Sequence, residues 1–297
     1  MKLSIVTICR NDREGLARTL ESTFEGQPGF CDWEQVVVDG ASTDGSADVL
    51  LRWKNDPRMG FCVSEPDSGI YNAMNKGLSR ARGDYLLFLN AGDRLLPDVL
   101  EKVFAEPVDA DVVYGDLFVA RRDGKPRLVR YPEEAAVTPA YFLFGSLPHQ
   151  AAFIARNLFE RFGGYREDFK IGSDSKFFLD CARSGTVRFK HLDFPVSTFA
   201  QGGLSTDPHK LEFGLEERVA WLSPVFGAYA ARKATFPPPP WWAGESVART
   251  SIRDHDFGRL LWAANRLSLL CWRIPPVRFL LRILLRGAAR IGRLFRR

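Results

Sequence analysis

Short apolar runs alternate with amphipathic segments along the first third of the chain. Four runs rich in Val, Ile, Leu and Phe have the composition of buried strands: residues 3–8, 34–39, 60–64 and 85–89. Three segments between them carry apolar side chains at helical spacing: residues 11–24, 46–54 and 70–82. Strands and helices that alternate with short connections predict an α/β fold with a parallel, doubly wound sheet.

The rest of the chain is less regular. We expect strands at three places: residues 111–114, 117–121 and 187–192. We expect helices at residues 156–162, 174–183 and 209–233, the last of them with a break around Ser223-Pro224. Four consecutive prolines then follow, and they cannot continue a helix because proline lacks the N–H group. Three parts are therefore predicted: a domain over 1–235, a Pro/Trp-rich linker over 236–258 and a basic helical tail over 259–297.

The net charge of +5 conceals an asymmetry between the tail and the body of the chain. From Arg259 onward there are ten arginines and no acidic residue, which leaves 31 basic and 36 acidic residues in 1–258, a net charge of about −5. A nucleic-acid enzyme is normally basic across its body, where the binding groove lies. We therefore expect no nucleic-acid partner.

A polar turn follows the second predicted strand. Asp39 ends this strand, and Gly40-Ala41-Ser42-Thr43-Asp44-Gly45 follows it. In parallel sheets ligands bind beyond the carboxyl ends of the strands, and a carboxylate there can accept hydrogen bonds from a base or a ribose. The alternative is an Asx turn that caps the next helix through Asp44 or Ser46.

The third predicted strand leads into a polar helix start. The segment Ser64-Glu65-Pro66-Asp67-Ser68-Gly69 carries two acids, and the helix after it bears Asn72, Asn75 and Lys76. Amides and carboxylates beside a helix N-terminus form a cradle suited to a sugar nucleotide. Asparagine is a poor helix former, so its presence there needs a reason. The alternative is that Asp67 and Ser68 only cap the helix.

The fourth predicted strand ends in Phe88-Leu89-Asn90-Ala91-Gly92-Asp93. A diphosphate needs its charge offset, and hard divalent cations bind carboxylate oxygens. Asp93 is well placed to supply such an oxygen. The alternative is an ordinary acid on a surface turn.

As a set, these segments resemble family 2 glycosyltransferases with the GT-A fold, and they are most similar to the branch that builds bacterial exopolysaccharides, such as the colanic acid transferases. The similarity is dense over residues 3–100 and thinner to about residue 205. It implies a Rossmann-like, nucleotide-sugar-binding sheet flanked by helices. It also implies an inverting enzyme that moves a sugar from a nucleotide-sugar donor to a saccharide or polyprenyl-linked acceptor, in exopolysaccharide or cell-surface polysaccharide synthesis.

The resemblance also implies roles for single residues. Asp39 would contact the nucleotide base and Asn90 the ribose. Further donor contacts are expected from Thr7, Arg10, Asp67, Asn72, Asn75 and Lys76. The family's metal-binding D-x-D motif has become Asn90-Ala91-Gly92, and Asp93 follows it. Asp93 is therefore the expected metal or diphosphate contact, with Mg²⁺ or Mn²⁺ as the cofactor.

The family's catalytic base lies in a Glu-Asp pair that opens a helix, and Gly172-Ser173-Asp174 occupies that place here. Asp174 would deprotonate the acceptor hydroxyl as the diphosphate leaves. The alternative is that Asp174 is a helix N-cap. Pro148-His149-Gln150 also resembles this branch, so His149 and Gln150 are expected to contact the acceptor or the diphosphate. A purely structural histidine is the alternative.

The basic tail has the composition of a helix that lies on a membrane surface. Arginines recur every four residues among apolar side chains, at Arg278, Arg282, Arg286 and Arg290. No run of 18 or more apolar residues occurs, so we expect no membrane-spanning helix. The five scattered cysteines suggest reduced thiols in a cytosolic protein. We therefore expect a cytoplasmic enzyme held on the anionic inner face of the plasma membrane. The alternative is a tail helix that packs on the domain or binds a partner.

Two other functions were compared with the glycosyltransferase. A nucleotidyltransferase usually has a glycine-rich basic signature near its first strand, and Cys9-Arg10-Asn11-Asp12 does not supply one. A non-catalytic, membrane-associated scaffold with the same fold is consistent with the altered D-x-D motif. Retention of Asp39, Asp67, Asp93 and Asp174 favours an enzyme.

Overall fold

The computed structural model describes residues 1–121, 124–203 and 211–235. Residues 1–237 form one compact unit. The expected linker over 236–258 and the expected basic tail over 259–297 lie outside the described residues, so both stay predictions. In the described part of the chain, no helix is long and apolar enough to cross a membrane.

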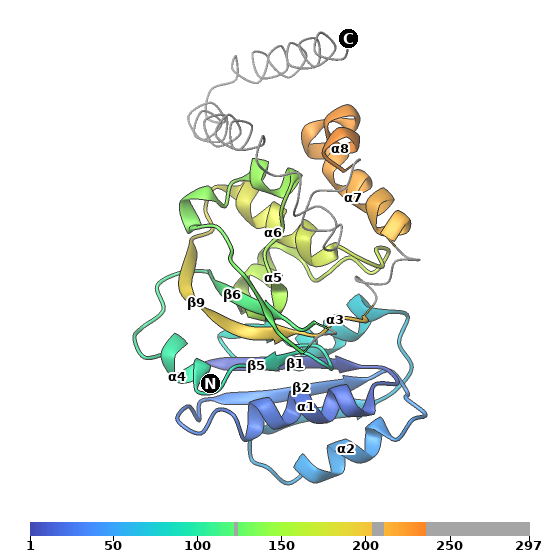
Figure 1. Cartoon of the computed structure of the whole chain (residues 1–297), viewed down its shortest axis with the longest axis vertical. Helices are drawn as coiled ribbons and strands as arrows, with labels where there is room; N and C mark the ends of the chain where they lie inside the picture. The colour runs from blue at the N-terminus through green and yellow to red at the C-terminus, as the bar shows by residue number, and fades with distance from the viewer. Residues whose placement is uncertain (122–123, 204–210, 236–297) are drawn as a thin grey trace. The chain divides into compact units, whose positions relative to one another are not determined.

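Four parallel strands form the first half of the central sheet (Figure 1). These strands are β1 (Leu3–Cys9), β2 (Trp33–Asp39), β3 (Met59–Ser64) and β4 (Tyr85–Phe88). Every residue of β1, β2 and β4 is buried, because elements cover both faces of the sheet there. The predicted parallel arrangement is confirmed for these four strands.

The second half of the sheet is mixed. Its strands are β5 (Arg94–Leu95), β6 (Val112–Val119), β7 (Arg127–Val129), β8 (Ala152–Ala155) and β9 (Phe189–Phe199). β8 pairs antiparallel with both β4 and β6, whereas β6 and β9 are parallel. The main path of the sheet is β3-β2-β1-β4-β8-β6-β9-β5, and β7 pairs with β6. The sequence predicted a parallel sheet, and the observed sheet is mixed in this half. The reason is that the short apolar strand β8 runs antiparallel to both of its neighbours, β4 and β6.

Three helices belong to the parallel half: α1 (Arg13–Phe24), α2 (Ser46–Trp53) and α3 (Ile70–Arg80). α1 and α2 lie together on one side of β1 and β2 (Figure 1). α3 packs directly on β1, and a Cβ atom at Gly77 would come within 2.4 Å of Val6. This close packing fixes α3 against the strands whose ends carry the predicted site.

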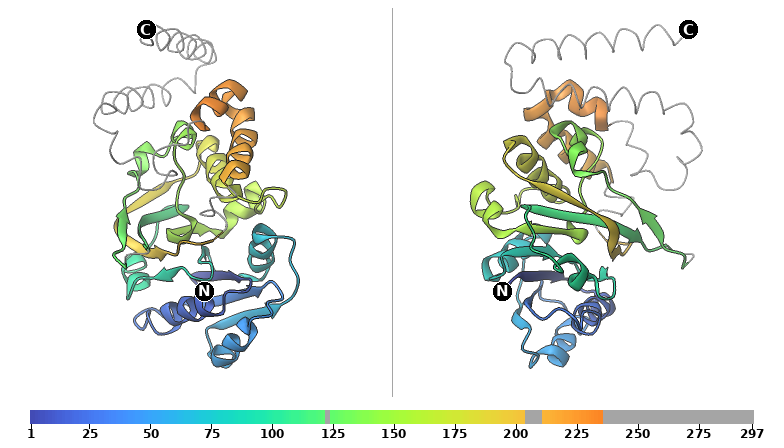
Figure 2. Two further views of the ribbon diagram at one scale, coloured as in Figure 1. Left: turned by 45° about the vertical axis from the view of Figure 1, so that its right-hand side comes forward. Right: turned by 90° about the vertical axis from the view of Figure 1, so that its left-hand side faces the viewer.

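The remaining helices are α4 (Val99–Val103), α5 (Arg156–Phe162), α6 (Ser173–Ser184), α7 (Leu211–Phe226) and α8 (Ala228–Thr235), with 3₁₀ turns η1 (Glu134–Ala136), η2 (Pro139–Leu143) and η3 (His149–Ala151). α5 and α6 lie across the sheet from α1 and α2, and α7 and α8 lie beyond α6 (Figures 1 and 2). The helix expected over 209–233 is divided at Gly227, whose φ is +85°, and Pro224 lies inside α7.

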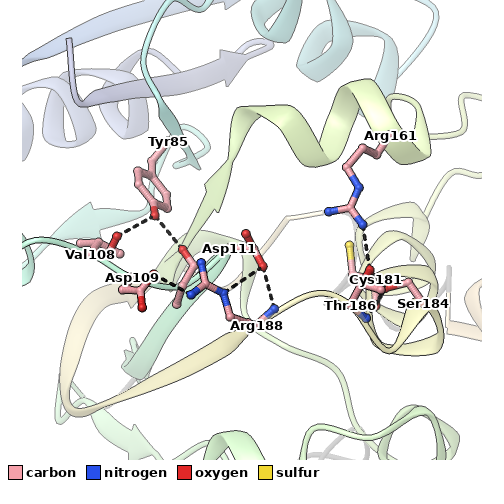
Figure 3. A network of polar contacts seen from close by, with 10 residues as sticks. Tyr85, Val108, Asp109, Asp111, Arg161, Cys181, Ser184, Thr186 and Arg188 are labelled. Carbon is pink, nitrogen blue, oxygen red and sulfur yellow. Dashed lines mark hydrogen bonds and ion pairs between the residues drawn. The ribbon is translucent and has the colours of Figure 1, made fainter.

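A polar network ties together the amino ends of β4, β6 and β9 (Figure 3). The Tyr85 hydroxyl donates to the carbonyl of Ala110 at 2.6 Å. The guanidinium of Arg188 forms an ion pair with Asp109, and the backbone N–H of Arg188 donates to Asp111 Oδ2 at 2.7 Å. The network stabilises the end of the strands away from the predicted site, which lies at the carboxyl end of β4.

Candidate active site

The turn after β2 and the segment before α3 meet at the carboxyl edge of the sheet. Arg10, just after β1, places Nη1 3.8 Å from Asp67 Oδ1. A Cβ atom at Gly40 would come within 2.2 Å of Asp67 Oδ2, so the Asp67 side chain lies directly against the Gly40 backbone. The structure therefore brings Arg10, Asp67 and the Asp39-Gly40 turn together, and their contact with a nucleotide stays a prediction.

Two of the expected nucleotide contacts are fully buried. Asp39 accepts hydrogen bonds from the Ser42 N–H at 3.0 Å and from the hydroxyls of Ser42 and Ser64. Thr7 Oγ1 accepts a hydrogen bond from Gln35 Nε2 at 2.9 Å. Both side chains have no exposed surface. In this structure Asp39 stabilises its own turn and Thr7 stabilises the sheet, and direct contact with a nucleotide stays a prediction for both.

The asparagines of α3 hold a neighbouring loop. Asn75 Nδ2 donates to the Tyr165 carbonyl at 2.7 Å, and Asn75 Oδ1 accepts from the Tyr165 N–H at 2.9 Å. A Cβ atom at Gly164 would come within 2.8 Å of Asn75 Oδ1. Asn72 Nδ2 donates to Glu167 at 2.9 Å. These bonds explain why two poor helix formers occur in α3: they fix the loop that leads to α6.

The two predicted cations of the donor site differ in exposure. Lys76 Nζ lies 2.6 Å from Glu65 Oε1 and donates to the Pro66 carbonyl at 2.8 Å. The side chain of Lys76 is 30% exposed, whereas that of Arg10 is 65% exposed. Arg10 is therefore the better placed of the two to contact a diphosphate.

Asp174 lies in a chain of polar side chains that come from four different segments. Asp174 Oδ2 is 2.8 Å from His149 Nδ1, and Asp174 Oδ1 accepts from the Tyr71 hydroxyl at 2.9 Å. His149 Nε2 is 3.4 Å from Asn90 Nδ2. Gln150 follows His149 in η3 and is buried. We call Tyr71, Asn90, His149 and Asp174 the Asp174 group. It connects the turn after β4 with the start of α6.

The start of α6 is not capped by Asp174. The residue before the helix is Gly172, and within the described structure no side chain of this segment caps it. The backbone N–H groups of Gly172 and Ser173 donate to the Tyr71 hydroxyl instead, at 2.7 and 3.0 Å. The N-cap interpretation of Asp174 is therefore wrong. No role for Tyr71 was predicted from the sequence.

The partners of Asp174 and His149 shift both pKa values toward the charged forms. Burial alone would raise the pKa of Asp174, but the hydrogen bond and charge of His149 and the bond from Tyr71 hold it below the usual value. Burial alone would lower the pKa of His149, but the bond and charge of Asp174 and the charge of Asp93 raise it. The carboxylate of Asp174 is therefore ionised at neutral pH.

The turn that carries Asp93 does not fit a cation site supplied by the protein. Asp93 is 3% exposed, and its Oδ1 accepts from the Ala200 N–H at 2.8 Å. Burial raises the pKa of Asp93 to about 7, against the opposing effects of that N–H and of the His149 charge. The other motif positions are the amide Asn90 and Gly92. In the parts of the chain that the structure describes, no three His, Cys, Asp or Glu side chains cluster as metal ligands would.

Helix α7 supports the loop before α6. Glu217 accepts hydrogen bonds from the Lys170 N–H at 2.6 Å and from the Ile171 N–H at 2.7 Å, one on each carboxylate oxygen. A Cβ atom at Gly172 would lie 3.2 Å from Trp221 Nε1. This support was not predicted from the sequence, because nothing in the local pattern of α7 indicates which distant loop it meets.

Comparison with known proteins finds similarity to glycosyltransferases in both the family models and the curated relatives. Residues 4–171 match the family model Glycosyl transferase family 2. An uncharacterized glycosyltransferase of Mycobacterium tuberculosis is 37% identical over 191 residues, which cover 61% of this chain and 68% of the relative. A PGL/p-HBAD biosynthesis glycosyltransferase of Mycobacterium bovis is 32% identical over 191 residues, covering 61% of this chain and 71% of the relative.

Solved structures of low sequence identity share the fold. S. aureus TarS 1–349 in complex with UDP-GlcNAc superposes with a TM-score of 0.62 at 17% identity, covering 89% of this chain and 79% of TarS 1–349. The mannosyltransferase PcManGT from Pyrobaculum calidifontis, in complex with GDP-Man and Mn²⁺, gives 0.55 at 20% identity, covering 94% and 82%. Because the family model spans more than half of the chain, this protein belongs to glycosyl transferase family 2 and is a glycosyltransferase with the GT-A fold.

Proposed function

We propose that the chain is an inverting glycosyltransferase that moves a sugar from a nucleotide-sugar donor to a saccharide or polyprenyl-linked acceptor in cell-surface polysaccharide synthesis. The observation that carries the proposal is the position of Asp174. Through His149, this partly buried carboxylate connects to Asn90 at the carboxyl end of β4, where ligands of such sheets bind. The relative from M. bovis is named for the biosynthesis of PGL and p-HBAD, which supports a role at the cell surface.

In this proposal Asp174 is the general base. The acceptor oxygen attacks the anomeric carbon, the bond from that carbon to the diphosphate oxygen breaks, and the acceptor proton passes to Asp174. The pKa of Asp174 is lowered, so the carboxylate is ready to accept a proton at neutral pH but is a weak base. Proton transfer must therefore accompany departure of the diphosphate, when the attacking hydroxyl has become strongly acidic. A single displacement inverts the anomeric configuration.

The donor would occupy the carboxyl edge of the sheet. We assign the diphosphate contact to Arg10, the ribose contact to Asn90 and the base contact to the turn around Asp39. His149, which lies between Asn90 and Asp174, and the adjacent Gln150 would contact either the diphosphate or the acceptor hydroxyl. The segment of Asp67, Asn72, Asn75 and Lys76 would form the wall of the pocket, and the two asparagines act mainly through the loop they hold.

The need for a divalent cation follows from the resemblance and not from the residues at this turn. A protein of the same fold holds Mn²⁺ together with its GDP-Man. Here Asp93 is buried and bonded to Ala200, and Asn90 and Gly92 offer no carboxylate. We derive no step through a cation. Positive groups that the described structure places near the donor edge include Arg10, Lys76 and, in its protonated form, His149.

The charge distribution supports a place at a membrane surface. The ten arginines of the tail are opposed by no acidic residue, while residues 1–258 carry about −5. Each arginine near an anionic leaflet contributes about 1 kcal/mol to binding. In this proposal the tail holds the enzyme peripherally on the cytoplasmic face, next to a polyprenyl-linked acceptor.

The test is a donor screen on the purified full chain. UDP-, GDP- and dTDP-sugars are compared by thermal shift with and without Mg²⁺ or Mn²⁺, and release of nucleoside diphosphate is then measured with each donor that stabilises the protein. With a saccharide acceptor present, the new glycosidic bond is examined by NMR for its anomeric configuration. We expect stabilisation, release and inversion. Retained configuration would contradict the single displacement, and the absence of both stabilisation and release would favour the non-catalytic scaffold.

A further inference from the structure

The Tyr71 hydroxyl makes three hydrogen bonds at the start of α6. It donates to Asp174 Oδ1 at 2.9 Å and accepts from the N–H groups of Gly172 and Ser173 at 2.7 and 3.0 Å. A phenol has one proton to donate and a lone pair for each acceptor bond. Because both backbone groups can only donate, the hydroxyl proton must point at Asp174. The direction of this bond is therefore fixed by its surroundings.

The same bonds solve a backbone problem of α6. The first N–H groups of any helix lack partners within the helix. α6 begins after Gly172, which has a φ of +94° and no cap from its own segment in the described structure. Tyr71 supplies the missing acceptor from α3, far away in the sequence. Asp174 is thereby left free to turn its other oxygen to His149.

Tyr71 is itself held rigidly. Its side chain is buried at 4% exposure, and its ring packs against that of Tyr165 with centroids 5.6 Å apart. Tyr165 belongs to the loop that Asn75 of α3 clamps through two backbone bonds. α3 is therefore linked to the approach to α6 at two points, one through Asn75 and one through Tyr71.

We infer that Tyr71 is a positioning residue for sugar transfer, which holds the Asp174 carboxylate toward the acceptor and ties it to the donor-side helix α3. This inference rests on the proposed role of Asp174 as the base. It gives the first turn of α3 a function besides donor contact: Tyr71 supports the base on the other side of the reaction. Tyr71 does not act as an acid or base itself, because burial and the charge of Asp174 raise the pKa of its hydroxyl well above the ordinary value.

Among the described residues, few titratable groups act on Asp174. His149 from η3 and Tyr71 from α3 bond to it directly. Burial, and to a smaller extent the charge of Asp174, raises the pKa of both Tyr165 and Tyr131. Both hydroxyls therefore stay neutral. A change in the titration of Asp174 on removal of the Tyr71 hydroxyl would therefore report the loss of that one bond.

Tyr71→Phe removes the hydroxyl and keeps the ring. Tyr165→Phe is the matched control: its ring touches that of Tyr71, it is equally buried, and its hydroxyl has no hydrogen-bond partner in the described structure. In the full chain, we expect Tyr71→Phe to lower kcat by about 10- to 100-fold, the size of effect that misplacement of a reacting group produces. Donor affinity should not change. Tyr165→Phe should leave both quantities as they are.

The pH profile separates positioning from general loss of structure. The bond from Tyr71 is one of the causes that lower the pKa of Asp174, so its removal should move the acid limb of kcat/KM to higher pH. The donors used are UDP-GlcNAc and GDP-mannose, and the rate is measured as release of UDP or GDP. Asp174→Asn is measured in parallel. If Asp174→Asn keeps its turnover, the assignment of Asp174 as the base is wrong. If Asp174→Asn loses turnover but Tyr71→Phe keeps both its turnover and its acid limb, the base assignment stands and the inference about Tyr71 is wrong.

A second measurement needs no donor. Hydrogen–deuterium exchange of the peptide that contains Gly172 and Ser173 should become faster in Tyr71→Phe, because both N–H groups lose their acceptor. It should stay at the wild-type rate in Tyr165→Phe. Unchanged exchange in Tyr71→Phe, or equal losses of activity in both variants, would overturn the inference, since the effect would then come from packing of the rings.

Discussion

Asp174 is a partly buried carboxyl group and Asp93 a buried one, and their surroundings differ in the number of donors. Asp174 has a donor on each oxygen, from His149 and from Tyr71, and its pKa is lowered. Asp93 has one backbone donor, from Ala200, and burial raises its pKa to about 7. At neutral pH the first carboxyl is ionised and the second is partly protonated. This separation of pKa values makes Asp174, and not Asp93, the group suited to act as a charged base.

Asp93→Asn tests the structural role of Asp93. Its pKa of about 7 in the folded protein lies above the value of about 3.9 for an unfolded chain, so the folded state keeps a proton that the unfolded state releases. The contribution of Asp93 to wild-type stability is therefore fully present below pH 4 and is lost as the pH rises from 4 through 7. Asparagine resembles the neutral form, so Asp93→Asn should gain on the order of 2–4 kcal/mol of unfolding free energy relative to wild type between pH 4 and pH 8.

The measurement is urea denaturation of both proteins at pH 4 and pH 8. Asp84→Asn, an exposed aspartate just before β4, is the control and should show no such difference. A stability difference for Asp93→Asn that does not change with pH would show that Asp93 titrates like an exposed carboxyl. The argument against a cation site at this turn would then lose its main support.

At the scale of helices and strands, the sequence predicted those elements whose signals lie within a few neighbouring residues. The buried runs of β1, β2 and β4 and the polar turns after them were predicted, because apolar runs and Gly/Asp turns are short-range signals. β8 was missed, because four apolar residues, Ala152–Ala155, do not distinguish a strand from a buried helix. The roles of Tyr71 and Glu217 were missed for another reason: each depends on a loop that meets it only in the folded chain.

Glu217→Gln tests whether α7 supports the start of α6. Each carboxylate oxygen of Glu217 accepts a backbone N–H of the loop, from Lys170 and from Ile171. An amide offers one acceptor and places an NH₂ group against the other N–H. We expect a loss of about 1–3 kcal/mol in unfolding free energy, the cost of leaving a buried hydrogen-bonding group unsatisfied. Turnover should fall as well, because the loop leads directly to Asp174.

Glu216→Gln is the control on the same helix. Glu216 is exposed, and its pairing with Arg232 at 3.9 Å is a surface ion pair of little energetic value. The two variants are compared by denaturation and by release of nucleoside diphosphate. Equal, small effects of both substitutions would mean that α7 does not hold the loop in place.

At the scale of the whole molecule, the charge is divided between a mildly acidic body and a strongly basic tail. We expect a chain truncated after Gly244 to bind nucleotide but not to sediment with anionic vesicles. Binding of the full chain should fall steeply with salt, because surface charges are screened within about 8 Å at physiological ionic strength. The apolar residues of the tail should leave a salt-resistant remainder.

A charge-removing variant shows which property of the tail matters. Replacing Arg278, Arg282, Arg286 and Arg290 by glutamine keeps the apolar residues and the chain length. It should abolish the salt-sensitive part of vesicle binding and keep the remainder. Equal co-sedimentation of the full and truncated chains would show that the tail does not bind the membrane, and the proposed location would be wrong.

The account depends most on Asp174 as the base. The most direct test is the ratio of turnover between Asp174→Asn and wild type, measured on the full chain with a donor whose binding to both proteins is determined separately. Asparagine keeps the shape and can still bond to Tyr71, but it cannot take the proton. The account predicts unchanged donor binding and a loss of transfer of about 10²-fold or more, the usual contribution of a general base. Near-normal turnover in Asp174→Asn would contradict it.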